Sequence, residues 1–301
     1  MRLVGVVDSN LERADAVARD FGCRAFGSID QLLTTHSEVQ AASVAVPTAQ
    51  HLQVARTLLQ AGIDLLIEKP LASSIAEADE LIPLSRTLNR VVQVGHLERF
   101  NPAVLATIPL ITQPMFFEVH RLSVFTPRSL DIDVVLDLMI HDLDIVLSFV
   151  NSPIKEIRAV GIPILSGKVD IANVRVEFAS GCVANFTASR VSTERVRKLR
   201  FFQPQQYISL DYSRPDVLVF SIDSELDGTP SANPQIKIAK PRVMAEEPRH
   251  AELQSFLHAV RTRSKPVVDL EDGRRALALA VDILNTIRTH ADKIQIERLH
   301  G

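Results

Sequence analysis

The sequence has few cysteines, no excess of charge of one sign and no long apolar run. Cys23 and Cys182 are its two cysteines; they lie far apart without the spacing of a metal site, and we interpret them as buried free thiols in a reducing compartment. Its 33 basic and 36 acidic residues give a net charge of -3, which argues against nucleic acid as a partner because such proteins usually carry a basic excess. No segment has the apolar length of a membrane span, and the first apolar run ends at Asp8, too early for a secretory signal. We therefore expect a cytoplasmic globular protein with no membrane partner.

A glycine-rich phosphate-binding turn is also missing. Residues Leu3 to Val7 are apolar and are followed by Asp8, which is typical of the second strand of a dinucleotide-binding fold. The first strand of such a fold is followed by Gly-x-Gly-x-x-Gly, but none of the 11 glycines has Gly-x-Gly spacing. We therefore expect about 30 residues, one strand and one helix, to be lacking before residue 1, so that the flanking strands face an unfilled slot. Two origins are open: a misassigned start codon, and a genuine short form that binds nucleotide poorly.

The two halves of the chain differ in their pattern of apolar residues. In the first half, short apolar strands alternate with helices, which predicts a parallel sheet covered on both faces. After residue 112, strand-like segments joined by hairpin signals predict a mostly antiparallel sheet. We expect an α/β chain: a Rossmann-like domain at 1–112 without its first strand, then an α+β domain at 113–301 with an open sheet. The expected strands are 3–7, 41–46, 64–67, 91–94, 115–122, 154–162, 171–178, 182–188, 199–202, 207–211 and 217–222; the expected helices are 10–21, 51–60, 75–88, 133–150, 250–263 and 271–290, with a long loop at 223–247.

The stretch Glu68-Lys69-Pro70 follows an apolar strand. Ligands of open α/β sheets bind beyond the carboxyl ends of the strands, so Lys69 is expected where a nicotinamide and a substrate meet. The alternative is a surface lysine paired with Glu68. Asp8 lies at the carboxyl end of the expected strand at 3–7. It is expected to bind the ribose hydroxyls and to favour NAD over NADP, although a helix cap would also explain it.

A second group of polar residues lies on the predicted helix at 133–150. This helix is apolar nearly all round, and its polar residues Asp133, Asp137, His141 and Asp144 recur at helical spacing, with Asp142 as the outlier. Asp137 and His141 are four residues apart, so the carboxylate is expected to orient the imidazole and raise its pKa, as suits a general acid/base. A satisfied buried His–Asp pair and a metal site are the competing interpretations.

The third group follows the strand at 91–94. His96 and Arg99 lie in the strand-to-helix turn at the ligand end of the sheet, and Asn101 before Pro102 reads either as a helix cap or as a substrate ligand. Arg121 and Arg128 add positive charge before the polar helix, which would suit a phosphate-bearing substrate. We assign His96, Arg99, Asn101, Arg121 and Arg128 to substrate binding.

These motifs resemble the Gfo/Idh/MocA oxidoreductase family. The resemblance rests on Glu68-Lys69-Pro70, on the stretch from Val44 to His51, and on Asp137-x-x-x-His141. It implies an NAD(P)-dependent enzyme that oxidises or reduces a ring hydroxyl of a sugar or nucleotide sugar. It further implies a dimer or tetramer that pairs through the open sheet.

The family resemblance also assigns roles to residues. Lys69 would be catalytic, Asp137 and His141 would lie at the substrate hydroxyl, and Glu68 with Lys69 would lie at the cofactor. The residues Pro47, Thr48 and His51 would contact the cofactor as well. A finer similarity, carried by "GHLERFNP" and "FTPRSLDIDVVLDLMIHDLDI", is to a bacterial subgroup related to UDP-N-acetylglucosamine 3-dehydrogenases.

Two other functions compete with the dehydrogenase. One is a catalytically impaired relative that only binds NAD or a sugar, which the missing glycine turn would support. The other is a metal-dependent hydrolase that uses Asp137, His141 and Asp144, although no further ligand motif accompanies them.

Overall fold

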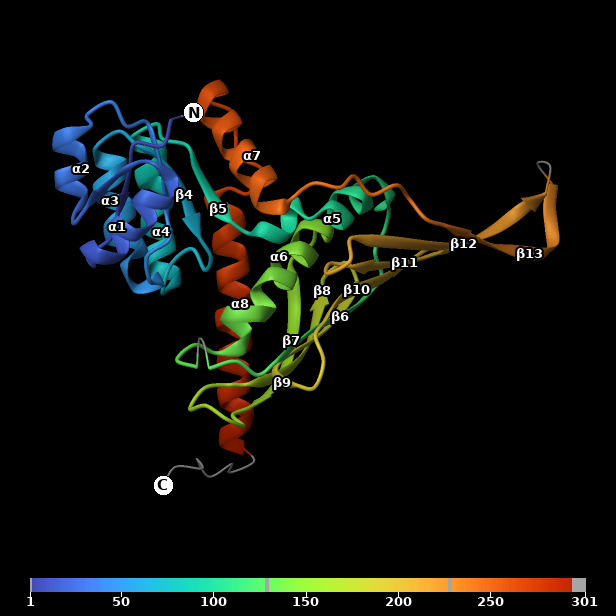
Figure 1. The fold of residues 1–301 in the computed structure, drawn as a ribbon. Helices are drawn as coiled ribbons and strands as arrows, with labels where there is room; N and C mark the ends of the chain where they lie inside the picture. Colours follow the sequence, from blue (N-terminus) through green and yellow to red (C-terminus); the bar gives the residue numbers. More distant parts are fainter. Residues whose placement is uncertain (1, 128–129, 227–228, 294–301) are drawn as a thin grey trace.

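The computed structural model describes residues 2–127, 130–226 and 229–293 (Figure 1). The first part of the chain contains β1 (Gly5–Val7), α1 (Leu11–Phe21), β2 (Arg24–Phe26), α2 (Ile29–Thr35), β3 (Ala41–Val44), α3 (His51–Gln60), β4 (Asp64–Glu68), α4 (Ile75–Thr87) and β5 (Val92–Gly95). All of its strand pairs are parallel, which confirms the Rossmann-like class. The short elements β2 and α2 were not anticipated, because 24–26 and 29–35 are too short to show a clear period.

The parallel strands fall into two separate sheets. β1 pairs with β2, and β3, β4 and β5 form a three-stranded sheet, but β1 and β3 do not pair with each other. The gap lies where the sequence predicts an unfilled slot. The backbone edges of β1 and β3 that face it therefore lack ladder partners within the described residues.

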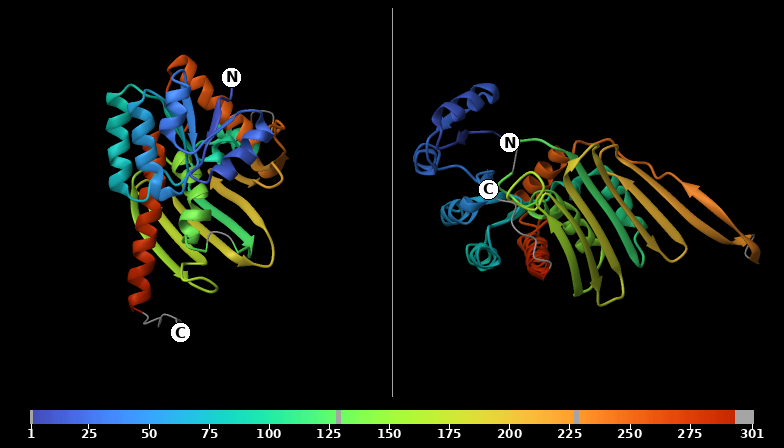
Figure 2. Two further views of the ribbon diagram at one scale, coloured as in Figure 1. Left: turned by 60° about the vertical axis from the view of Figure 1, so that its left-hand side comes forward. Right: turned by 90° about the horizontal axis from the view of Figure 1, so that it is seen from below.

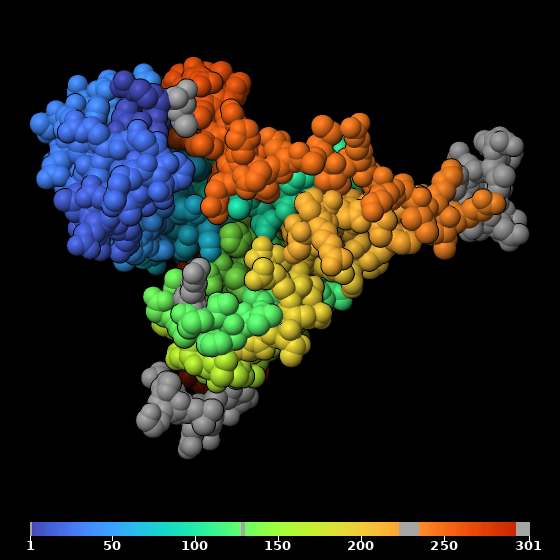
Figure 3. Space-filling model, viewed as in Figure 1, coloured from blue at the N-terminus to red at the C-terminus, as the bar shows by residue number. Residues whose placement is uncertain are grey.

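The second part of the chain is built on one large sheet. Its strands are β6 (Phe116–Val124), β7 (Ile154–Ile162), β8 (Ile171–Phe178), β9 (Val183–Ser192), β10 (Val196–Gln203), β11 (Gln206–Asp211), β12 (Asp216–Leu226) and β13 (Thr229–Ala239). Their order is β13-β12-β11-β10-β6-β9-β8-β7, antiparallel except for the β6–β9 pair. This confirms the mostly antiparallel open sheet. The expected loop at 223–247 is wrong, since β12 and β13 form a long hairpin there that projects from the body (Figures 1 and 3).

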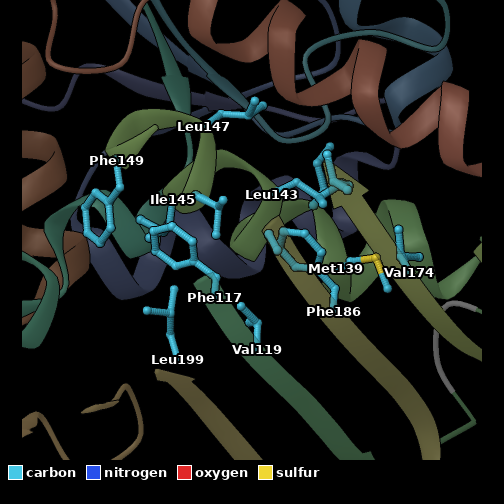
Figure 4. Close-up of a cluster of buried hydrophobic side chains, with 14 of the residues drawn as sticks. Phe117, Val119, Met139, Leu143, Ile145, Leu147, Phe149, Val174, Phe186 and Leu199 are labelled. Carbon is cyan, nitrogen blue, oxygen red and sulfur yellow. The ribbon is translucent and has the colours of Figure 1, made fainter. Parts of the chain in front are cut away.

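One face of this sheet carries the helical layer (Figure 2). The helix expected at 133–150 begins as a π-helical segment, Val135–Met139, and continues as α6 (Ile140–Phe149). Together with α8 (Leu270–Lys293) it buries the apolar residues of alternate sheet positions, among them Phe117, Phe186 and Leu199 (Figure 4). The opposite face of the sheet is covered by no helix in the part of the chain that the structure describes (Figure 2).

Two C-terminal helices return to the first half. Phe256 and Ala259 of α7 (Pro248–Thr262) pack on Leu66 and Val91 of the parallel sheet. Leu270 and Leu277 of α8 join the core of the first half, while Ile283 and Ile287 belong to the core of the second. A boundary near residue 112 remains our proposal for the division of the chain, and α7 and α8 tie the two parts together across it.

Candidate active site

The side chain of Lys69 bridges the two halves of the chain. It follows β4 at a cis Lys69–Pro70 peptide, at the carboxyl end of the sheet where the sequence places it. Its Nζ donates a hydrogen bond of 2.7 Å to the backbone oxygen of Asp137 and lies 3.6 Å from Oδ1 of the same residue. Burial lowers the pKa of Lys69, while Asp137 and Glu68 oppose the shift. The amine is therefore mostly buried and held toward the second half of the molecule.

The expected pairing of Asp137 with His141 is wrong. The π-helical segment ends two residues before His141, so the four-residue spacing does not set the two side chains in α-helical register. The Asp137 side chain instead lies beside Lys69, and His141 Nδ1 is buried without a hydrogen-bond partner in the described residues. Asp137 thus acts on the lysine and not on the imidazole.

The expected rise in the pKa of His141 is also wrong. Burial lowers the pKa of His141 well below 6.5, and the positive charges of Lys69 and Arg121 lower it further. Lys69 binds the backbone oxygen of Asp137, four residues before His141, so the lysine lies near the segment that carries the imidazole. At neutral pH the imidazole is therefore uncharged and able to accept a proton.

A second imidazole, His96, lies beside this pair. It is 1% exposed, and both of its ring nitrogens lack a partner within the described residues. Burial lowers its pKa, and Lys69 and Arg99 contribute to the shift. His96 is therefore a buried, neutral ring, and its assignment to substrate binding stays a proposal.

The arginines assigned to substrate binding are engaged with buried carboxylates. Arg99 contacts both carboxylate oxygens of Asp144, at 2.6 and 3.0 Å. Arg121 is 3% exposed and binds Asp142 at 2.7 and 2.9 Å and Glu98 at 3.0 Å. Every side-chain nitrogen of Arg121 donates to a carboxylate, so Arg121 is corrected to a structural ion pair. Arg99 uses only Nε and Nη2 for Asp144, and its assignment to substrate binding stays a proposal. Arg128 lies outside the described residues.

Asn101 and His51 are likewise occupied by backbone groups. Asn101 accepts a hydrogen bond from the Ala103 amide and donates to Glu98 and to the Tyr212 carbonyl, so it caps α5 (Pro102–Thr107) and does not face a substrate. The buried ring of His51 lies within hydrogen-bond distance of the carbonyls of Pro70 and Leu71 through Nδ1 and of Val46 through Nε2. Both ring nitrogens face backbone carbonyls. His51 therefore links the loop at Pro47 to the loop after Lys69, and neither nitrogen is available to a cofactor.

The remaining candidate cofactor residues share one edge of the parallel strands. Asp8 follows β1, Pro47 and Thr48 begin a 3-10 turn after β3, and Glu68 is the exposed last residue of β4. The Asp8 carboxylate accepts a hydrogen bond from the Asn10 amide and lies 3.4 Å from Arg13. This row of polar residues fits the ribose and nicotinamide ends of a dinucleotide, and the described residues supply no glycine turn for its pyrophosphate.

Two titratable residues near the site were not anticipated. Arg197 of β10 lies two residues before the buried Leu199 and four before the buried Phe201, so all three point to the face that carries the helices. This period of two is the sequence signal that could have found Arg197. Glu252 of α7 is 4% exposed, and burial together with the nearby Glu68 raises its pKa to about 7. No sequence pattern connects α7 with β4, so Glu252 could not be found that way.

No cluster of metal-ligating side chains occurs among the residues that the structure describes. Over the same residues, no helix is long and apolar enough to cross a membrane. Both described cysteines are free, and burial raises the pKa of the Cys182 thiol to about 11.

Comparison with known proteins places this chain among oxidoreductases. Residues 1–96 match the model of an oxidoreductase family with an NAD-binding Rossmann fold, and residues 116–205 match a GFO/IDH/MocA C-terminal domain. The UDP-N-acetylglucosamine 3-dehydrogenase of Acidithiobacillus ferrooxidans is 38% identical over 285 residues, 94% of this chain and 88% of the relative. A crystal structure of the enzyme of that name from the same organism superposes with a TM-score of 0.87 at 36% identity, covering 95% of this chain and 90% of that one. The inositol 2-dehydrogenase of Leifsonia xyli is 30% identical over 160 residues, which cover 51% of this chain and 47% of the relative.

Proposed function

The chain belongs to the Gfo/Idh/MocA family of NAD-dependent oxidoreductases, and from that premise we propose that it oxidises the C3 hydroxyl of UDP-N-acetylglucosamine or reduces the corresponding ketone. The observation that carries the proposal is the hydrogen bond from Lys69 Nζ to the backbone oxygen of Asp137, which joins a strand end of the first half to the helical segment that leads into His141. The nucleotide-sugar substrate is supported by the similarity to the Acidithiobacillus enzyme, which extends over nearly the whole chain.

His141 is the proposed base. A neutral imidazole accepts the proton of the substrate hydroxyl without first releasing one of its own, and the low pKa of His141 keeps it neutral over the working range. A positioned base of this kind contributes about 10²–10⁴-fold to the rate. Bound NAD supplies the hydride acceptor.

Lys69 is the proposed partner of this base. Its ammonium group is held by the Asp137 backbone oxygen and by the Asp137 carboxylate, so it needs no reorganisation as the alkoxide charge develops. Burial strengthens the interaction by excluding water. Lys69 thus stabilises the oxyanion that His141 creates.

The uncovered face of the large sheet is the proposed contact between copies of this chain, as a dimer or tetramer. Phe116, Phe202, Tyr207 and Phe220 form a continuous aromatic row across four strands, with ring centroids 5.7, 4.9 and 5.4 Å apart. Ile238 pairs with Phe220 in register and is 65% exposed, so the row continues onto the projecting hairpin. An exposed apolar row of this length favours burial against another surface. A cytoplasmic location, with its reducing conditions, agrees with the two free thiols.

The activity is tested with the purified chain, UDP-N-acetylglucosamine and NAD, by the absorbance of NADH. Lys69→Met and His141→Ala should each lower kcat at least about 100-fold. Lys155→Met is the matched control, because Lys155 is exposed on β7 and pairs with Glu177 away from the site. Unchanged turnover in both site variants would contradict the assigned roles.

The same assay separates the competing functions. A metal-dependent hydrolase would form no NADH with or without a chelator, whereas the dehydrogenase should form NADH in the presence of a chelator. A relative that only binds its ligands would bind NADH and give no turnover with either the nucleotide sugar or myo-inositol.

A further inference from the structure

Arg197 lies on the face of the large sheet that carries the helical layer. Leu199 and Phe201, at the next alternate positions of β10, are buried on this same face, and the cross-strand neighbour of Arg197 on β6 is Arg121. Two arginines therefore stand side by side under the helix that carries His141. Like charges opposite one another on a sheet are unfavourable unless each is compensated.

Within the described residues, only one of these two arginines has an ion-pair partner. Arg121 is bound by Asp142 and Glu98, and nearby Arg99 is bound by Asp144. Arg197 makes no ion pair with any described residue, and its Nε is buried without a hydrogen-bond partner. Arg195, exposed just before the same strand, adds a second positive charge close to it.

The charge of Arg197 reaches the proposed base. Its cross-strand neighbour Arg121 binds Asp142, the residue next to His141, so Arg197 lies in the neighbourhood of the site, and its positive charge helps to lower the pKa of His141. A buried donor without a partner destabilises the folded protein, and the cost disappears when a ligand supplies an acceptor. A planar guanidinium prefers a carboxylate or phosphate as that acceptor.

We propose that Arg197 binds the diphosphate of a nucleotide sugar and thereby selects anionic substrates over neutral polyols. This inference rests on the proposed function, since it places the sugar ring at Lys69 and His141. The diphosphate of such a substrate is attached to the anomeric carbon of the same ring, so the group that binds it has to lie near the base. Arg197 is a cation that the sheet holds near the base and that no carboxylate of the described residues binds directly.

A purely structural role for Arg197 gives different expectations. Arg121 pairs with two carboxylates, those of Glu98 and Asp142, so this cluster has a net negative charge. Arg197 offsets that charge without contacting either carboxylate. If this were its whole purpose, its loss would lower stability and would affect every substrate alike.

The experiment compares Arg197→Gln with Arg200→Gln. Arg200 lies on the same strand but on the opposite face, where it pairs with Glu118 at 3.1 Å, so its substitution removes the same charge away from the site. Calorimetry measures binding of UDP to each protein, and kinetics measure KM and kcat for UDP-N-acetylglucosamine and for the neutral sugar N-acetylglucosamine.

We expect Arg197→Gln to weaken UDP binding about 10- to 100-fold and to raise KM for the nucleotide sugar by the same factor, with kcat nearly unchanged. Turnover of the neutral sugar and the melting temperature of Arg197→Gln should stay as in the wild type, and Arg200→Gln should leave UDP binding and the KM for the nucleotide sugar unchanged. Equal UDP binding by the wild type and Arg197→Gln, or an equal loss with both sugars, would overturn the inference.

Failure of the proposed function gives a separate result. If the wild type binds UDP through Arg197 but oxidises no nucleotide sugar, the anion site stands and the assigned reaction fails. If the wild type turns over the nucleotide sugar and Arg197→Gln does so with the same KM, the reaction stands and the anion site fails.

Discussion

The Nζ of Lys69 donates a 2.7 Å hydrogen bond to the backbone oxygen of Asp137, 68 residues further along the chain. The lysine belongs to the end of a parallel strand, and its acceptor belongs to a π-helical segment under the antiparallel sheet. A backbone acceptor cannot be removed by exchanging a side chain, so the two halves are held in register at the site whatever residue occupies position 137.

The acid limb of the wild-type pH profile should lie below pH 6.5. Burial and the charge of Lys69 lower the pKa of His141, so its neutral, proton-accepting form persists to lower pH than that of a free imidazole. The measurement is kcat/KM between pH 5 and 9. An acid limb above pH 6.5 would show that the base is a different group or that His141 is charged in the free enzyme.

Asp137→Asn should move the alkaline limb and leave the acid limb in place. The Asp137 carboxylate raises the pKa of Lys69 against the effect of burial, so its neutralisation lowers that pKa and the ammonium form is lost at lower pH. Asp133→Asn is the control, because the Asp133 carboxylate is engaged elsewhere, by the Val169 amide. A shifted acid limb would instead support the pairing of Asp137 with His141 that the spacing suggested.

Arg121→Met should destabilise the protein by about 3–5 kcal/mol, because it leaves the buried Asp142 carboxylate without a partner. Urea denaturation measures the change, and the double variant Arg121→Met/Asp142→Asn should recover part of it. Arg158→Met, which breaks an exposed pair with Glu156, should leave the denaturation midpoint almost unchanged. Equal effects of the two single variants would show that the buried ion pair contributes no more than a surface one.

Glu252→Gln should stabilise the protein at pH 8 by roughly 2–3 kcal/mol and have little effect near pH 5. The folded-state pKa is raised from 4.5 to about 7, so the wild type loses stability as pH rises through this interval and carries the full cost of a buried charge above it. Melting temperatures at both pH values measure the effect. Glu246→Gln, at an exposed position before the same helix, should be neutral. A stabilisation by Glu252→Gln that does not change with pH would show that the buried carboxylate charge is not its cause.

Phe202→Glu should dissociate the assembly. Phe202 is 39% exposed and stands in the aromatic row of the uncovered sheet face, where a carboxylate could not be buried against another copy. Light scattering after gel filtration measures the mass. Leu165→Glu, at an exposed loop position between β7 and β8, is the control and should leave the mass unchanged. A wild-type protein that is monomeric at micromolar concentration would refute the proposed contact.

The positions of most elements, and the edge of the sheet at which the chemistry lies, could be predicted from the order of the residues alone. Apolar runs and turn residues located α3 at its observed bounds and most strands to within a few residues, because burial of alternate or consecutive side chains leaves a local pattern. Lys69, Asp8 and Glu68 could be placed at one edge because the carboxyl ends of parallel strands meet there.

The role of each polar side chain depends on partners that are brought to it by folding. Arg99 and Arg121 looked like free cations, but the carboxylates that neutralise them lie 45 and 21 residues away along the chain. The four-residue spacing of Asp137 and His141 gave the wrong partner, since a π-helical segment and the contact with Lys69 changed its geometry. Ionic and hydrogen-bonding partners are set by proximity in space, and a single sequence records proximity only within a helix turn or a strand pair.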